Sequence, residues 1–277
     1  MVMKEHDKTD RIHRVVRERY AEIARTEIAV PDAACCGPSN EELSRRNGYS
    51  DEQLGLTPEG ANLGLGCGAP LNHAGLVGGE TVLDLGSGAG FDAFLAAREV
   101  GPAGRVVGVD MTAEMIDKAR ANAERAGVTN VEFRLGQIED LPVDDASVDL
   151  VISNCVINLV PDKGAVYREV ARVLKPGGRM LVSDVVLDIE LPEFIAENVA
   201  ALTGCVAGAL LRTDYLGAIE AAGLGEIEIL KDSSFGAAAL ELVPASLLEE
   251  ARRREVDVAE VVEGVRSLTI RATRLAS

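Results

Sequence analysis

The sequence has no tryptophan, and only 3% of its 277 residues are aromatic. It is also short of positive charge, because 28 Lys and Arg against 45 Asp and Glu leave a formal net charge of −17. An acidic field repels phosphate backbones, and nucleobases stack on aromatic side chains. The one basic run, Arg252-Arg253-Arg254, is flanked by glutamates and fits a solvated helix face. These shortages argue against a nucleic-acid partner.

Long apolar runs are missing as well. No stretch approaches the roughly 20 apolar residues that a membrane-spanning helix needs. The N-terminal segment, MVMKEHDKTDRIHRVVRERY, is charged throughout and has no apolar signal-peptide centre. We therefore expect a cytoplasmic protein without a membrane partner, and the acidic surface favours a monomer.

Cysteine is scarce and irregularly spaced. The five cysteines are Cys35, Cys36, Cys67, Cys155 and Cys205, and they form no CxxC pair. An odd number in a reducing compartment argues against a disulfide framework, and the missing CxxC argues against a preformed structural zinc site. Chemistry, binding of a soft ion and plain burial remain open for these side chains.

What the chain does contain, from about residue 80, is a regular alternation of apolar strands and helices. Strands are expected at 81–85, 105–109, 131–135, 148–153 and 179–186. Helices are expected at 91–100 and 112–126, and a third in YREVARVLKPGG at 167–178, where Pro176 and Gly177 stop it. Such alternation indicates an α/β fold with a parallel sheet covered on both faces. Segments 226–230 and 267–273 are expected to pair as an antiparallel sixth and seventh strand.

Three segments are expected along the chain. Residues 1–75 hold an amphipathic helix at 8–27 and then cysteine-bearing loops rich in Gly, Pro, Ser and Asn. Residues 76–232 form the core, with a helical cap at 190–224 that contains Cys205. Residues 233–277 form a helical excursion and the final strand.

The first strand runs into GSGAG at 86–90 and then a helix. Glycines let a ligand approach the main chain closely, and open α/β sheets bind ligands at the carboxyl ends of their strands. Asp110 ends the second strand, 110 − 90 = 20 residues after Gly90, where a carboxylate can accept hydrogen bonds from ribose hydroxyls. A dinucleotide-binding GxGxxG needs Gly or Ala at position 91, which is Phe91.

The GxGxG spacing instead resembles the first motif of class I S-adenosylmethionine-dependent methyltransferases. That resemblance implies a Rossmann-like seven-stranded sheet, mostly parallel with an antiparallel last strand. It also implies that Asp84 lies near the methionine end of the cofactor and that GQIEDLP at 136–142 is the adenine-binding turn. The expected cofactor-binding residues are Asp84, Gly86, Ser87, Gly88, Gly90, Asp110, Met111, Gln137, Ile138, Glu139 and Asn154. The same sequence pattern also fits Met111 as a core residue and Asn154 as a residue that only forms the turn.

The fourth strand ends in Ser153-Asn154-Cys155-Val156, without the Asn/Asp-Pro-Pro-aromatic motif typical of enzymes that methylate nucleobase amines. Cys155 is expected at the mouth of the cofactor site. Cys67, in GLGCGAP, and Cys205, in LTGCVAGA, are expected to converge on the same mouth. Three thiolates select soft, thiophilic ions, although each cysteine alone is equally compatible with packing.

Together, CCGP, PEGANLGLGCGAP, LDLGSGAGFD, VDMTAEMIDKAR, SNCVINLVPDK and GCVAGAL closely resemble arsenite S-adenosylmethionine methyltransferases. The resemblance covers about residues 33 to 225. It implies that Cys67, Cys155 and Cys205 bind trivalent arsenic, with arsenite and methylarsenite as substrates in detoxification. It further implies that Cys35 or Cys36 supports turnover by forming a disulfide with Cys67, later reduced by thioredoxin or glutathione.

Arsenic held by thiolates keeps a lone pair that can accept a methyl group, so no general base is required. Two alternatives remain open. A small-molecule C- or O-methyltransferase of the quinone-biosynthesis type shares the VDMTAEM-like and VLKPGGR-like segments, but has no use for three separated cysteines. A non-catalytic metalloid-binding protein has no use for GSGAG and Asp110.

Overall fold

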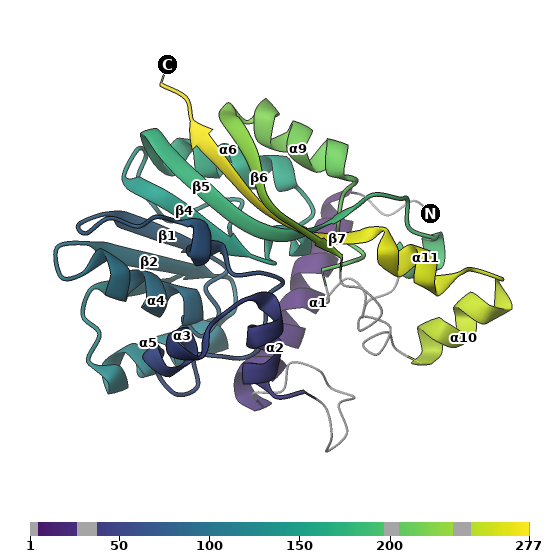
Figure 1. The fold of residues 1–277 in the computed structure, drawn as a ribbon, viewed down its shortest axis with the longest axis horizontal. Coiled ribbons are helices and arrows are strands. Elements are labelled where there is room, and N and C mark those ends of the chain that lie inside the picture. The colour runs from purple at the N-terminus through teal and green to yellow at the C-terminus, as the bar shows by residue number, and fades with distance from the viewer. Residues whose placement is uncertain (1–4, 27–37, 197–204, 235–244, 277) are drawn as a thin grey trace.

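The computed structural model describes residues 5–26, 38–196, 205–234 and 245–276 (Figure 1). The strands are β1 (Thr81–Leu85), β2 (Arg105–Asp110), β3 (Val131–Leu135), β4 (Val148–Asn154), β5 (Leu174–Leu187), β6 (Leu224–Ser234) and β7 (Val265–Arg274). They form one sheet in the order β3-β2-β1-β4-β5-β7-β6. β1 to β5 are paired in parallel, and β7 is antiparallel to both β5 and β6. The expected Rossmann-like fold class is confirmed.

Helices cover both faces of this sheet, and others lie at and beyond its carboxyl edge (Figure 1). They are α1 (Glu5–Thr26), α2 (Asn40–Asn47), α3 (Asp51–Leu56), α4 (Phe91–Val100), α5 (Ala113–Ala126), α6 (Lys163–Val173), α7 (Glu193–Ala196), α9 (Arg212–Ala221), α10 (Ala245–Arg253) and α11 (Val258–Glu263). Two 3₁₀ turns are η1 (Pro70–His73) and η2 (Ile157–Leu159). No described helix is both long and apolar enough to cross a membrane.

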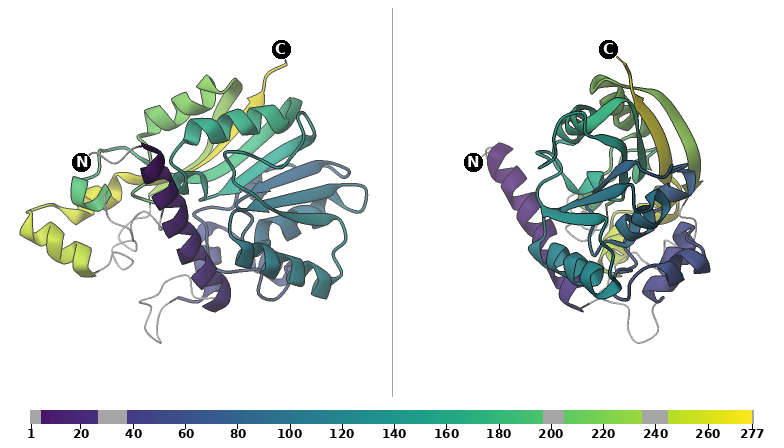
Figure 2. Two further views of the ribbon diagram at one scale, coloured as in Figure 1. Left: turned by 180° about the vertical axis from the view of Figure 1, so that it is seen from behind. Right: turned by 90° about the vertical axis from the view of Figure 1, so that its left-hand side faces the viewer.

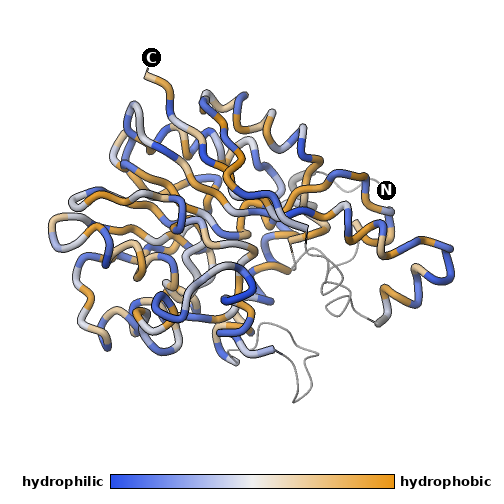
Figure 3. The backbone as a smooth tube through the Cα atoms, in the orientation of Figure 1, coloured by the Kyte–Doolittle hydropathy of each residue, from blue (hydrophilic) through white to orange (hydrophobic). Residues whose placement is uncertain are grey.

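Successive strand residues face opposite layers, because side chains alternate across a strand. In β1, Leu83 belongs to the same apolar cluster as Tyr167 of α6 and Tyr215 of α9, whereas Val82 belongs to a second cluster with residues of α4 and α5. Both layers are apolar, so the central strands appear as hydrophobic runs in Figure 3. The sheet is therefore buried on both faces, so a ligand reaches it at the carboxyl ends of its strands.

α1 runs beside that carboxyl edge, as the view from behind in Figure 2 shows. Its amphipathic pattern was predicted from the sequence, and its buried residues include Val16, Ile23 and Ala24. His13 Nε2 lies 2.8 Å from Glu139 Oε1, and Arg25 pairs with Glu114 at 2.8 Å. The N-terminal helix is thus fastened to residues that follow β2 and β3.

Two expectations about secondary structure need correction. The cap at 190–224 is helical only in α7 and α9 among the described residues, with 197–204 outside them, and Cys205 lies in a turn with φ 67°. The helix that was expected to stop at Pro176 and Gly177 ends at Val173, because Pro176 cannot continue it. β5 begins at Leu174, which pairs with Val148 ahead of a β-bulge, so this strand starts five residues earlier than expected (179 − 174 = 5).

Candidate active site

The glycine turn after β1 uses its glycines for two purposes. Gly86, Gly88 and Gly90 have φ of 64°, 52° and 95°. A Cβ on Gly86 would lie 2.4 Å from Val156 Cγ2, so this turn packs directly on the residue after Cys155. A Cβ on Gly88 would meet only Met115 Sδ at 3.9 Å, which leaves room for a ligand. The turn therefore joins the two predicted binding regions.

Asp110 holds the same turn from β2. Its Oδ2 accepts a hydrogen bond from Gly88 N at 3.0 Å, and its Oδ1 accepts one from Thr112 N at 2.8 Å. Burial raises the pKa of this carboxyl, while the two backbone amides act in the opposite direction. A carboxylate has about four lone-pair sites, so acceptor capacity remains for ribose hydroxyls.

A cleft lies next to Asp110, between α1, α5 and the turn after β3. The cleft, of about 320 Å³, is lined by Arg17, Met111, Ala113, Glu114, Leu135, Gly136 and Gln137. Ser87 Oγ is buried and faces Gly108 of β2, where a Cβ would lie 2.7 Å from it, so this hydroxyl does not line the cleft. Ile138 instead belongs to the core, and Glu139 pairs with His13. Of the predicted adenine turn, Gly136 and Gln137 line this cleft, and its binding of adenine stays a prediction.

Asp84 forms a buried acidic pair with Asp92 on α4. Burial raises the pKa of Asp84 well above its usual value, and the charges of Asp92 and Asp110 add to this. Tyr49 donates to Asp92 Oδ1 at 2.6 Å, and Asn154 Nδ2 lies 3.2 Å from Asp92 Oδ2. Two desolvated carboxylates favour a positively charged group between the strand ends. A cofactor ammonium has that charge.

Asn154 connects the end of β4 with the loop of Cys67. Its Oδ1 accepts from Cys67 N at 3.1 Å, and its Nδ2 donates to the Gly68 carbonyl at 2.8 Å. These two hydrogen bonds indicate that Asn154 positions Cys67. The same side chain also reaches the Asp92 carboxylate, so a role beside the cofactor stays a prediction.

Three cysteines from distant parts of the chain meet beside this edge. Cys155 N donates to the Ser183 carbonyl at 2.8 Å, and Cys67 Sγ lies 3.5 Å from the same oxygen. Cys205 Sγ donates to the Cys155 carbonyl at 2.9 Å. The structure thus brings these three cysteines together, whereas Cys35 and Cys36 lie outside the described residues.

Two of the three cysteines have left-handed backbone conformations. Cys155 has φ 62° and Cys205 has φ 67°. A residue with a Cβ is strained there, and such strain collects at functional sites. The hydrogen bonds of Cys155 N and Cys205 Sγ hold this arrangement in place.

The thiols are held in their protonated form. Burial is the main cause that raises the pKa of Cys67. For Cys155, the hydrogen bond with Cys205 lowers the pKa, but the bond with Cys67 and burial outweigh it. For Cys205, the bond with Cys155 and burial both raise the pKa. The pocket therefore presents neutral thiols at neutral pH.

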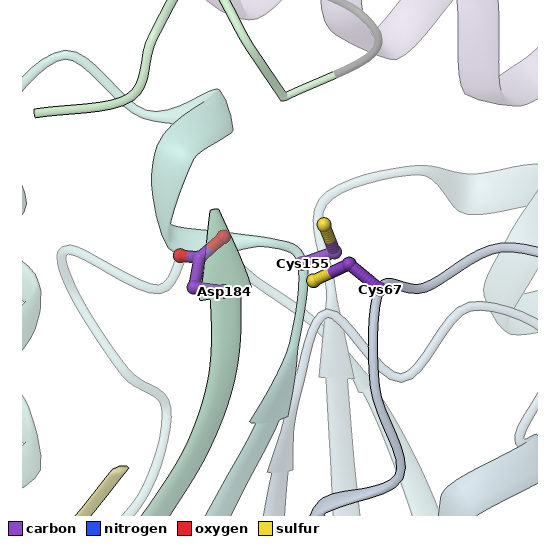
Figure 4. Close-up of side chains that lie close together, drawn as sticks. All are labelled: Cys67, Cys155 and Asp184. Carbon is purple, nitrogen blue, oxygen red and sulfur yellow. The ribbon is translucent and has the colours of Figure 1, made fainter. Parts of the chain in front are cut away.

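Asp184 lies beside the cysteines, and the sequence did not single it out. One of its carboxylate oxygens and the Sγ atoms of Cys67 and Cys155 all lie within 4.8 Å of one another (Figure 4). Burial raises its pKa to about 7, although the backbone amide of Val185 and the charge of Lys163 oppose the rise. The available signal was its place near the end of an apolar strand, like Asp84 and Asp110.

Replacing Asp184 by asparagine is expected to stabilise the fold at high pH. Between about pH 4 and pH 7 the folded state keeps a proton that an unfolded carboxyl of pKa 3.8 has lost, so wild-type stability falls as pH rises. Asp184→Asn removes this loss and should gain about 4 kcal/mol at pH 8 and little near pH 4. Denaturant unfolding of the reduced protein measures both values. An equal difference at both pH values would contradict the assignment.

Tyr20 of α1 joins the cofactor and thiol regions. It packs against the apolar cluster that contains Cys67 and Cys205, and against a second cluster that contains Ala89 and Met115. Burial raises the pKa of its phenol, and Cys205, Cys155 and Asp110 add to this effect. The amphipathic pattern of 8–27 predicted the helix, but nothing in it predicted where the helix docks.

Alanine at Gly86 is expected to disturb both regions at once. Gly127, with φ 65° and open space where a Cβ would stand, is the matched control for backbone strain alone. Gly127→Ala should cost about 1 kcal/mol. Gly86→Ala should cost more, by about 1–3 kcal/mol, since Val156 must also move. Thermal unfolding of the two variants compares them, and equal losses would disprove the coupling to Val156.

Comparisons with known proteins agree with this geometry. A family model described as Methyltransferase domain matches residues 76–223, more than half of the chain. Arsenite methyltransferase from Halobacterium salinarum is 50% identical over 231 residues, which are 79% of this chain and 59% of that protein. Arsenite methyltransferase from Mus musculus is 36% identical over 74% of this chain and 56% of its own length. The chain thus spans less than two thirds of either relative.

Among solved structures, an arsenic(III) S-adenosylmethionine methyltransferase from Chlamydomonas reinhardtii superposes with a TM-score of 0.60 at 31% identity. The match covers 87% of this chain and 75% of that one. The chain belongs to the methyltransferase-domain family and, within it, to the arsenite methyltransferases.

Proposed function

We propose that this protein transfers methyl groups from S-adenosylmethionine to trivalent arsenic held by Cys67, Cys155 and Cys205. The convergence of these three side chains beside the glycine turn and Asp110 is the observation that carries the proposal. Carbon and oxygen nucleophiles need no such cluster. The names of the relatives support the same substrate.

Arsenite binding suits neutral thiols. Arsenous acid, As(OH)₃, reacts with three thiols to give an arsenic tris-thiolate and three waters. Each thiol proton leaves with a hydroxide, so no base has to accept it. The raised pKa values of Cys67, Cys155 and Cys205 are therefore compatible with tight binding. Because the reactants and the products are both uncharged, the affinity for arsenite should be nearly constant from pH 6 to pH 8.

S-adenosylmethionine, when bound, supplies a methyl group on a positively charged sulfur. The chain contributes positioning, which for well-oriented groups reaches effective molarities of about 10⁵–10⁸ M. Asp110 fixes the turn through Gly88, and Gly86 packs on Val156 beside Cys155. Asn154 holds the loop of Cys67. These contacts set the distance between the methyl donor and the arsenic.

Turnover needs two electrons for each methyl group. The new carbon–arsenic bond uses the arsenic lone pair, which raises the arsenic oxidation state by two. We propose that Cys35 or Cys36 forms a disulfide with Cys67, which releases two electrons and two protons. Thioredoxin or glutathione then reduces that disulfide. A location in the cytosol fits this scheme, because the cytosol keeps thiols reduced. We also propose that the protein is a monomer.

The test is arsenite-dependent formation of S-adenosylhomocysteine in the presence of a thiol reductant. Product that rises with arsenite, and not with a demethylated quinone, supports the proposal. Product with the quinone alone would favour the C- or O-methyltransferase alternative. Tight binding of arsenite without any S-adenosylhomocysteine would favour a non-catalytic metalloid-binding protein.

A further inference from the structure

The buried carboxylate of Asp184 has no task in arsenic methylation as proposed above. Arsenic(III) takes three soft thiolates, and a carboxylate is a hard ligand that adds little to them. Yet an Asp184 oxygen and the sulfurs of Cys67 and Cys155 all lie within 4.8 Å of one another. Figure 4 shows the two cysteines on adjacent loops beside β5, which bears Asp184.

Two thiolates and a carboxylate form a donor set for zinc. Zinc binds cysteine sulfur at about 2.3 Å and carboxylate oxygen at about 2.0–2.2 Å, in tetrahedral geometry. Neighbouring ligand atoms are then about 3.5–3.8 Å apart. Displacements of the side-chain atoms by about 1 Å would bring the three residues to these separations. Changes of side-chain rotamer on binding are common and can supply such displacements.

The local charges also suit a divalent ion. Two thiolates and one carboxylate carry three negative charges, of which Zn²⁺ neutralises two. Lys163 is buried, donates to the Val160 carbonyl at 3.1 Å, and lies close enough for its charge to act on Asp184. The charges of the ion, its three ligands and Lys163 therefore sum to zero in a buried site.

We propose that Cys67, Cys155 and Asp184 form a Zn²⁺ site that overlaps the arsenic pocket. Binding exchanges two thiol protons for two zinc–sulfur bonds and adds one zinc–oxygen bond. Cys205 stays outside, because its Sγ donates to the Cys155 carbonyl, and a water fills the fourth position. Zn²⁺ should then compete with arsenite for two thiols; this competition rests on the proposed function, whereas the zinc site does not.

The two ions use different third ligands, so variants can separate them. The probe is Zn²⁺ titrated into the reduced protein against a chromophoric chelator, with Co²⁺ absorption to show thiolate ligation. Asp184→Asn should weaken Zn²⁺ binding tenfold or more and leave arsenite binding within twofold. Its amide oxygen can still accept from Asn158 and Val185, and its amide group can donate to Tyr215 Oη, so the fold is kept.

Cys205→Ser is the matched variant with the opposite expectation. It should weaken arsenite binding strongly and leave Zn²⁺ binding within twofold. Equal loss of both ions in either variant, or unchanged Zn²⁺ affinity in Asp184→Asn, would overturn the zinc site. If wild-type protein binds Zn²⁺ in this pattern but never methylates arsenite, the proposed function fails and the zinc site stands.

Discussion

Replacement of Cys155 by serine is expected to lower the rate of arsenite methylation on the order of 10³-fold. The pocket loses one soft ligand, and the arsenic is no longer held in a fixed position. The hydroxyl of serine is a poor ligand for arsenic and rarely ionises. Initial rates with saturating S-adenosylmethionine measure the loss.

The control for Cys155→Ser is cofactor affinity in the same protein sample. Cys155 lies next to the glycine turn through Val156 but does not hold it, whereas Asp110 does. The dissociation constant of S-adenosylmethionine should therefore change less than about threefold, the scale of an indirect contact of a few tenths of a kcal/mol. Methylation that persists in this variant would show that Cys155 serves only in packing.

Asp110→Ala should weaken S-adenosylmethionine binding about 100-fold, since charge-assisted hydrogen bonds contribute about 1.5–3 kcal/mol each. The variant loses acceptors for the ribose, and the amides of Gly88 and Thr112 lose their partner. Isothermal titration of the reduced protein measures the dissociation constant, and arsenite binding should stay nearly unchanged.

Asp117→Ala is the matched control for Asp110→Ala. Asp117 is an exposed aspartate on α5, close in sequence to Asp110 but on the solvent side of its helix. Its loss should leave cofactor affinity within twofold, as is usual for surface changes of less than about 0.5 kcal/mol. If both variants lost affinity equally, net charge and not the carboxylate of Asp110 would explain the effect.

Local patterns predicted most of the core correctly. Apolar strand runs, GSGAG and the acidic end of β2 depend on neighbouring residues, and β1, β2 and β3 fall at or within one residue of the expected positions. The start of β5 was wrong because Leu174 becomes a strand residue only by pairing with Val148. Long-range pairing of this kind leaves no mark in a local pattern.

The sequence predicted those site residues whose positions follow from the ends of parallel strands. The ends of β1, β2 and β4 lie at one edge of the sheet, so Cys155 and Asp110 were expected at the same edge. Asp184 was missed because its setting comes from Asn158, Tyr215 and Lys163 on three different elements. The docking of α1 was missed because an amphipathic helix specifies that it packs, but not on which surface.

The most direct test of arsenic methylation at the three thiols is a single-turnover experiment. Reduced protein would be mixed with one equivalent of arsenite and excess S-adenosylmethionine, without added reductant, and arsenic species would be identified by mass spectrometry. We expect close to one methylated arsenic per protein chain, and none with Cys205→Ser. Unmethylated arsenite recovered in full from wild-type protein that binds both ligands would contradict the proposed function.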